Sequence, residues 1–221
     1  MQFNNIKGFA FDLDGVIADT ARFHGQAWHQ TADEVGTVWT DELAENLKGI
    51  SRMDSLELIL NAGGYGQKYT TAQKETLATQ KNDKYLELIK TLTPADILPG
   101  MKKFLDELKD QQYHLSVASA SKNAPTILKQ LKLTDYFDGI VDPATLHAGK
   151  PDPEIFVKAA EVMGLDPVNV AGLEDSSAGI TSINSAGELS IGIGSQLNEA
   201  KIKFAVTDEV SLVAIKTQLI G

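Results

Sequence analysis

Cysteine is absent from the 221-residue chain, which excludes disulfides, zinc–thiolate sites and a thiol nucleophile. Long apolar runs are absent as well. No stretch approaches the length needed to span a bilayer, and residues 1–7 lack the apolar core of a signal peptide. We therefore expect a cytoplasmic protein without a membrane partner.

Positive charge is scarce. The chain has 20 Lys and Arg residues against 30 Asp and Glu residues, so its formal net charge is −10. This balance disfavours nucleic acid as a partner, although local cations and a metal would still allow a small anionic substrate. Hydrophobic residues make up 43% of the chain, enough for one large domain or for a core with a smaller insert. We expect a monomer.

Apolar runs alternate with helical patterns along most of the chain. Apolar residues at helical spacing predict helices over residues 101–108, 127–131 and 155–163. This alternation predicts an α/β fold, a doubly wound parallel sheet with helices on both faces and a ligand site at the carboxyl ends of its strands. The predicted strands are residues 8–11, 114–118, 139–141, 169–173 and 189–193, with 204–206 as a weaker candidate.

Residues 20–92 interrupt the alternation, because they contain helical stretches but no convincing strand. Residues 48–52 within them have the composition of a loop. We interpret this region as an all-helical insert between the first and second strands. The expected division is an α/β core of residues 1–17 and 95–221 and a helical cap of residues 18–94.

Two carboxylates, Asp12 and Asp14, follow the first predicted strand. Side by side they repel each other unless a cation or a proton intervenes. Gly15 permits a tight turn that lets both face one cleft. The alternative is an ordinary acidic turn. An EF-hand is excluded because the chain has no third ligand and no closing Glu at the required spacing.

Two further strand ends carry groups suited to phosphate. Ser119 and the run Ser121, Lys122 and Asn123 lie where a strand gives way to a helix, so hydroxyls, backbone N–H groups and an ammonium meet there. Their simpler interpretation is a helix cap. Lys150 is held by the prolines that follow it, and its simpler interpretation is a surface lysine.

Glu174 and Asp175 follow another apolar strand and offer the hard oxygens that Mg²⁺ prefers. With Asp12 they carry three negative charges, which one Mg²⁺ and Lys150 would neutralise. An incoming phosphate would then meet a roughly neutral site. All of these groups are expected at one edge of the sheet.

Taken in order, these motifs resemble the four motifs of the haloacid dehalogenase superfamily, and the resemblance covers the whole chain. It implies that Asp12 is the nucleophile, which becomes phosphorylated, and that Asp14 is the general acid and base. It further implies that Ser119 and Lys150 hold the transferring phosphoryl group. The implied Mg²⁺ ligands are Asp12, Asp14 through its backbone carbonyl, Glu174 and Asp175.

Within that superfamily, His24 and residues 14–20, 48–55, 81–83 and 119–123 resemble the corresponding parts of the β-phosphoglucomutases. The resemblance implies interconversion of β-glucose 1-phosphate and glucose 6-phosphate through β-glucose 1,6-bisphosphate as activating intermediate. It places the second phosphate at Arg52, Ser121, Lys122 and Asn123, and sugar or cap contacts at His24, Lys48, Gly49, Ser55, Lys81 and Asn82. A phosphatase of the same fold and a catalytically silent phosphate-binding protein are the alternatives. For His24 alone, a structural histidine is the simpler interpretation.

Overall fold

The computed structural model describes residues 3–220. Its six strands form one sheet in the order β3-β2-β1-β4-β5-β6, and all neighbouring strands pair in parallel, as the sequence predicted. The central strand β1 is buried along its whole length, which is typical of parallel sheets covered on both faces. The strands are β1 Gly8–Phe11, β2 His114–Val117, β3 Gly139–Ile140, β4 Val170–Glu174, β5 Leu189–Ile193 and β6 Ile202–Phe204.

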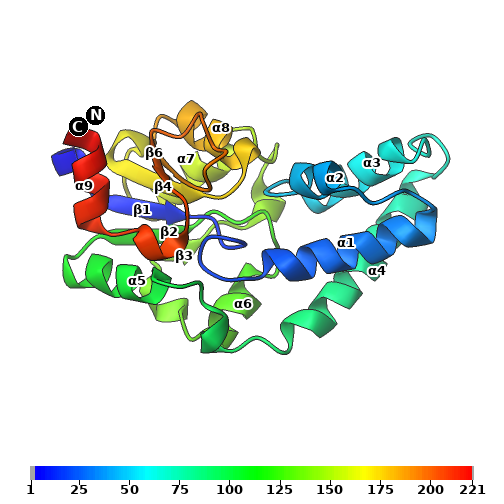
Figure 1. The fold of residues 1–221 in the computed structure, drawn as a ribbon, viewed down its shortest axis with the longest axis horizontal. Coiled ribbons are helices and arrows are strands. Elements are labelled where there is room, and N and C mark those ends of the chain that lie inside the picture. The colour runs from blue at the N-terminus through cyan, green and yellow to red at the C-terminus, as the bar shows by residue number, and fades with distance from the viewer. Residues whose placement is uncertain (1–2, 221) are drawn as a thin grey trace.

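Helices fall into two groups, those that cover the sheet and those inserted after β1 (Figure 1). The covering helices are α5 Met101–Asp110, α6 Ala124–Gln130, α7 Glu154–Val162, α8 Ser177–Ala186 and α9 Leu212–Ile220. The inserted helices are α1 Ala21–Val35, α2 Asp41–Asn46, α3 Arg52–Ala62 and α4 Thr71–Ile89. Among residues 3–220, no helix combines the length and apolarity that a bilayer crossing requires.

Successive side chains of β1 point to opposite faces of the sheet, so the strand contributes to the apolar core on both faces. Phe9 and Phe11 pack against Phe104 of α5, with ring centroids 5.8 and 6.3 Å away. Ala10 points to the other face and belongs to the apolar cluster formed by α7 and α8. The sheet is therefore covered on both faces, and its carboxyl edge is the part left available for a site.

The predicted strands agree closely with the structure except for the last. Strands β1 and β5 have the predicted bounds, β2 and β3 end one residue before the predicted end, and β4 is shifted by one residue towards the C-terminus. The candidate strand 204–206 was wrong, since β6 is Ile202–Phe204 and Val206 lies outside it, 54% exposed. The loop expected at residues 48–52 ends one residue early, because Ser51 caps α3 and Arg52 begins it.

The inserted helices have a small core of their own, which includes Trp28, Leu56 and Leu60. Two chain segments connect them to the sheet and lie side by side. Ala18 pairs with Ile97 in an antiparallel bridge, and the N–H of Leu98 donates to the carbonyl of Ile17 over 2.9 Å. The segments are thus joined at the point where the helices meet the sheet, close to the end of β1.

Candidate active site

The turn after β1 brings two carboxylates to the edge of the sheet. Asp12 is 3% exposed, and Asp14 lies two residues further along. Gly15 has a φ of 82°, and a Cβ built on it would overlap the carboxylate of Asp175. Glycine is therefore required here both by the left-handed backbone and by the close approach of Asp175.

Lys150 joins the carboxylates that follow β1 and β4. Its Nζ donates to Oδ1 of Asp12 over 2.6 Å and to Oε2 of Glu174 over 2.7 Å, and its side chain is fully buried. Carboxylate oxygens of Asp12, Glu174 and Asp175 all lie within 4.8 Å of one another. The structure thus brings together four residues that are up to 163 positions apart in the chain.

The electrostatics of this cluster favour a cation. Burial and the charge of Glu174 raise the pKa of Asp12 well above its usual value, even though Lys150 opposes the shift. Burial and Glu174 also raise the pKa of Asp175 to about 8. Burial lowers the pKa of Lys150, but its two carboxylate partners more than offset this and raise it overall. Three clustered carboxylates and one ammonium leave an excess of negative charge, and hard oxygen donors fit Mg²⁺.

Glu174 is held rigidly by the start of α8. Its Oε1 accepts from the Ser176 hydroxyl over 2.8 Å and from the Ser176 N–H over 3.1 Å. Gly179, one turn into the helix, has no room for a Cβ because the Glu174 carboxylate lies against it. One oxygen of Glu174 is thereby fixed by α8, and the other faces Lys150.

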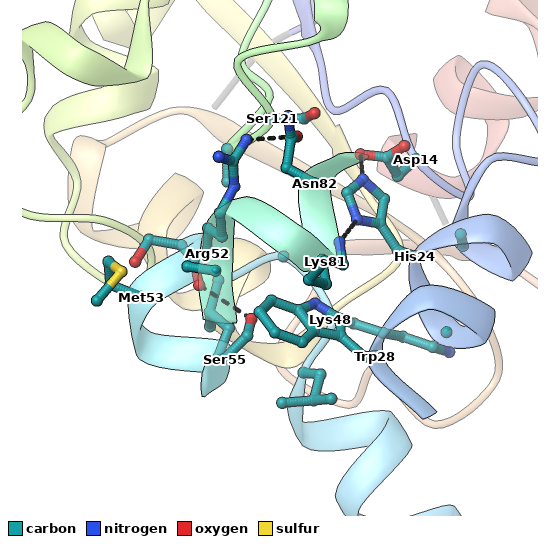
Figure 2. A pocket seen from close by; sticks show the side chains of 18 of the residues that line it. Asp14, His24, Trp28, Lys48, Arg52, Met53, Ser55, Lys81, Asn82 and Ser121 are labelled. Atoms are coloured by element: carbon teal, nitrogen blue, oxygen red, sulfur yellow. Dashed lines mark hydrogen bonds and ion pairs between the residues drawn. The ribbon is translucent and has the colours of Figure 1, made fainter. Parts of the chain in front are cut away.

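A second group of residues surrounds Asp14. Thr20 donates a hydrogen bond to Oδ1 of Asp14, and Nε2 of His24 lies 3.6 Å from Oδ2, beyond hydrogen-bond distance. Nδ1 of His24 is 2.8 Å from Nζ of Lys81 (Figure 2). A protonated Lys81 can only donate, so Nδ1 accepts and the ring hydrogen of a neutral His24 faces Asp14.

Burial controls the protonation of this group as well. Burial, followed by the charges of Lys81 and Arg52, lowers the pKa of His24 well below its usual value. Burial also lowers the pKa of Lys81 to about 7. Burial raises the pKa of Asp14, and Thr20 and Lys81 oppose that shift. The net effect is a raised pKa, so Asp14 holds a proton more readily than an exposed aspartate does.

A third group contains Arg52 and the loop after β2. Nη2 of Arg52 donates to Oδ1 of Asn82 over 2.7 Å (Figure 2), and Nδ2 of Asn123 donates to the same oxygen over 3.0 Å. Arg52 and Asn82 belong to inserted helices, whereas Asn123 and its neighbour Ser121 belong to the sheet domain. Asn82 thus bridges the two parts of the molecule.

One cavity of about 590 Å³ connects the three groups. It lies between the inserted helices and the sheet edge, and most of the residues predicted for the site line it. These are Asp12, Asp14, His24, Lys48, Gly49, Arg52, Ser55, Lys81, Asn82, Ser121, Lys122 and Asp175. The predicted residues outside its lining are Ser119, Lys150, Asn123 and Glu174.

Several predicted residues have partners of their own. Ser119 is fully buried, and its hydroxyl accepts from the Ser121 N–H over 3.1 Å. The Ser55 hydroxyl donates to the carbonyl of Ser51 over 2.9 Å. Lys48 pairs with Glu45 on the surface at 2.7 Å. These three side chains are positioned by local contacts.

Sequence reasoning missed Thr20, Tyr85 and Ser176. Tyr85 stacks on His24 with ring centroids 3.9 Å apart, and Thr20 and Ser176 hold the carboxylates of Asp14 and Glu174. Ser176 belongs to the motif that contains Glu174, and its position as a helix cap was a usable signal. Nothing in the sequence marks Tyr85, since its contact with His24 arises from the packing of α1 and α4, whereas Thr20 reaches Asp14 through the turn between β1 and α1.

The fold and the site define an α/β enzyme that works with carboxylates at the edge of a parallel sheet, beneath inserted helices. Comparison with known proteins supports this class of enzyme. The family described as haloacid dehalogenase-like hydrolase matches residues 6–187. The chain belongs to this family, and within it to the β-phosphoglucomutases.

Individual relatives support the narrower assignment. The β-phosphoglucomutase of Bacillus subtilis (strain 168) is 47% identical over 189 residues, which cover 86% of this chain and 84% of that protein. A crystal structure of β-phosphoglucomutase from Clostridium difficile has a TM-score of 0.93 and 40% identity, with 96% of each chain covered. A phosphorylated carbohydrates phosphatase of Thermotoga maritima is 28% identical over 199 residues, 89% of each chain.

Proposed function

We propose that this enzyme is a β-phosphoglucomutase, an isomerase that interconverts β-D-glucose 1-phosphate and glucose 6-phosphate. The observation that carries the proposal is a single cavity that is lined both by Asp12 and Asp175 of the carboxylate cluster and by the basic groups Arg52 and Lys122. A mutase needs both, because its intermediate carries two phosphates. The 47% identity to a β-phosphoglucomutase supports the same activity.

Asp12 is assigned as the nucleophile. An oxygen of its carboxylate forms a bond to phosphorus while the bond between phosphorus and the sugar oxygen breaks, which gives phosphoryl-aspartate. Lys150, 2.6 Å from Asp12, holds one carboxylate oxygen and offsets the charge that the phosphoryl group brings. Mg²⁺, held by Asp12, Glu174, Asp175 and the backbone carbonyl of Asp14, would supply further positive charge at the transferring phosphoryl group.

Asp14 is assigned as general acid and base. Protonated, it donates a proton to the sugar oxygen that leaves phosphorus. Ionised, it removes the proton of the hydroxyl that attacks phosphoryl-Asp12. The raised pKa of Asp14 suits both roles, since the proton must be held in one half-reaction and released in the other.

The two half-reactions share one bound species. Phosphoryl-Asp12 donates its phosphoryl group to β-glucose 1-phosphate, and the product is β-glucose 1,6-bisphosphate. The sugar then turns end for end, and Asp12 accepts the phosphoryl group from carbon 1. Arg52, Ser121, Lys122 and Asn123 are assigned to the phosphate that is not transferred. Arginine suits that role because its planar fork binds two phosphate oxygens.

Residues 18–94 are assigned as a cap over the core of residues 1–17 and 95–221. Two contacts support a closed arrangement. A Cβ on Gly49 of the cap would overlap the Ser176 hydroxyl, and a Cβ on Gly149 of the core would lie 3.7 Å from the Cβ of Ser51. Closure excludes water, which would otherwise hydrolyse phosphoryl-Asp12. The monomeric state and the cytoplasmic location remain predictions.

A phosphatase is the second candidate, because the Thermotoga maritima relative acts on phosphorylated carbohydrates by its name. A coupled assay separates the two activities. Formation of glucose 6-phosphate from β-glucose 1-phosphate, stimulated by added β-glucose 1,6-bisphosphate, is the result expected for a mutase. Release of inorganic phosphate at the same rate as substrate loss would refute the mutase.

A further inference from the structure

The cavity extends into the cap beyond the residues assigned to the two phosphates. On α4 it is lined by Asn82, which contacts Arg52, and then by Thr79, Ala78 and Glu75. These positions follow one face of the helix over seven residues, about 10 Å at 1.5 Å per residue. We call this extension, lined by Trp28, Trp39, Ala44, Leu47 and Ala78 with Glu75 and Thr79, the cap lobe.

The walls of the cap lobe are apolar. Both tryptophans of the protein line it. Trp28 lies beneath Lys81, on the side of the cavity away from Ser121 and Asn82 (Figure 2). A phosphate or a lone hydroxyl would find few partners against such walls, whereas the C–H face of a sugar ring packs well on an indole.

Trp39 is held in place as a wall. Its ring stacks on His29, with centroids 4.9 Å apart and an angle of 12° between the planes. The loop that carries Trp39 is anchored by the buried Thr37, whose hydroxyl donates to the carbonyl of Ile59 over 2.9 Å. Glu75 and Thr79 are exposed, so the cap lobe opens to solvent there and provides polar groups at its mouth.

The end-for-end turn of the sugar restricts what can use the cap lobe. Turning a hexose so that carbons 1 and 6 exchange places also exchanges carbons 2 and 4, but it leaves carbon 3 on the same side. A substituent on carbon 2 or 4 would therefore face different walls in the two half-reactions. Consider the line that joins the two phosphates of the bound bisphosphate. Only a substituent on carbon 3 stays on the same side of this line in both half-reactions, so only such a substituent can occupy the lobe throughout the cycle.

We propose that the cap lobe is a subsite for a second sugar linked to carbon 3 of the hexose, so that the enzyme also binds and isomerises 3-O-glycosylated hexose phosphates. The inference rests on the mutase proposed above. Trp39 contacts the apolar face of the second sugar, the buried Trp28 closes the inner end of the lobe, and Glu75 and Thr79 are placed to accept or donate hydrogen bonds with the sugar hydroxyls.

Calorimetry with two probes, glucose 6-phosphate and 3-O-glucosyl-glucose 6-phosphate, tests the subsite in the Mg²⁺-loaded enzyme. The dissociation constants of the wild type for the two probes should lie within about threefold of each other, because the lobe receives the second sugar. Trp39→Ala, which removes the wall, and Ala44→Leu, which fills the lobe, should each weaken the disaccharide phosphate relative to glucose 6-phosphate by about tenfold. Trp39→Phe keeps an aromatic wall and should keep the wild-type ratio.

Two outcomes would overturn the subsite. One is a wild type that binds the disaccharide phosphate more than about a hundredfold more weakly than glucose 6-phosphate, a loss of the size expected when a pocket excludes a group. The other is an unchanged ratio in both Trp39→Ala and Ala44→Leu. Conversion of β-glucose 1-phosphate is measured separately on the wild type. Its failure would refute the mutase, whereas an active enzyme with an unchanged ratio would refute the subsite alone.

Discussion

The ammonium of Lys81 lies 2.8 Å from Nδ1 of His24, and the contact directs the opposite edge of the imidazole towards Asp14. Both residues come from inserted helices, whereas Asp14 belongs to the turn after β1. Lys81 also lies 4.5 Å from the ring centre of Trp28 and 4.9 Å from that of Tyr85. The inserted helices thus contribute a buried amino group whose position is determined by contacts on three sides.

We predict that Lys81→Met lowers kcat/KM for β-glucose 1-phosphate by at least about tenfold. The change removes the donor to His24 and a positive charge beside the sugar phosphate, and a charge-assisted hydrogen bond is worth about 1.5–3 kcal/mol. Lys84→Met is the matched control, because Lys84 is three residues along the same helix and pairs on the surface with Glu34 at 2.7 Å. Equal losses in the two variants would contradict a role for Lys81 in the site.

The two carboxylates after β1 should respond differently to amide substitution. Asp12→Asn should abolish labelling by a phosphoryl donor, because an amide cannot form the phosphoryl-aspartate. Asp14→Asn should still be labelled by acetyl phosphate, whose acetate leaves without help from an acid. Its mutase rate should fall by about 10²–10⁴-fold. Loss of labelling in Asp14→Asn would mean that Asp14 supports Asp12 itself.

Gly49→Ala should impair catalysis without comparable loss of stability. Gly49 has a φ of 72°, and an added Cβ would overlap the Ser176 hydroxyl of the core, so the cap would no longer close fully. We expect kcat/KM to fall by at least about tenfold, since misplacement by 1 Å can cost about a hundredfold. Gly64→Ala is the matched control. Gly64 has a φ of 74°, but no atom lies within 4 Å of a Cβ built there.

Both Gly49→Ala and Gly64→Ala place alanine in a left-handed conformation, which costs roughly 1–2 kcal/mol. Their melting temperatures should therefore fall by similar amounts. A parallel fall in the activity of Gly64→Ala would show that backbone strain, rather than contact with the core, explains the loss in Gly49→Ala.

Glu188, which lies outside the candidate active site, should make the unfolding free energy depend on pH. Its carboxylate is buried, both oxygens lack a hydrogen-bond partner within residues 3–220, and burial raises its pKa well above 4.5. The folded protein therefore holds a proton that the unfolded chain releases. The resulting stability is fully present below pH 4.5 and is lost as the pH rises through the folded-state pKa.

Glu188→Gln should remove this loss. We expect the variant to exceed the wild type in unfolding free energy by about 1 kcal/mol or more at pH 8, and by less at pH 5, because one pKa unit corresponds to about 1.4 kcal/mol. Urea denaturation at the two pH values measures the difference. Glu161→Gln, at an exposed position of α7, is the control and should show no pH-dependent gain. A gain independent of pH would refute the explanation.

The order of motifs along the chain was enough to predict the sheet and the carboxylate cluster, since parallel strands bring their carboxyl ends to one edge. Strand β6 was misplaced because a continuous apolar run was sought, whereas this edge strand alternates, with Ile202 and Phe204 buried and Lys203 exposed. The contact of Tyr85 with His24 could not be predicted, because it depends on how α1 and α4 pack. The contact of Thr20 with Asp14 depends on the exact conformation of the turn after β1, which the sequence pattern does not specify.

Arg52 provides the sharpest separation of mutase from phosphatase. Its guanidinium, partly buried, donates to Asn82 over 2.7 Å, and burial lowers its pKa below the usual value. Within the proposed cycle it contacts the phosphate that is not transferred, so it matters for sugar bisphosphate but not for attack by Asp12. Arg52→Ala should therefore lower conversion of β-glucose 1-phosphate by about ten- to a hundredfold, the loss expected for one charge-assisted pair.

Phosphorylation of Asp12 by acetyl phosphate, measured on the same preparation of Arg52→Ala, should continue at a rate close to that of the wild type, because this small donor does not reach Arg52. Arg52→Lys keeps the charge but loses the planar fork, and we expect it to recover part of the activity. Arg22→Ala is the control for charge, since Arg22 also lines the cavity but pairs with Asp96 at 2.8 Å. Equal losses of Arg52→Ala in both assays would show that Arg52 supports the fold or the carboxylate cluster, and the phosphatase would then be the better assignment.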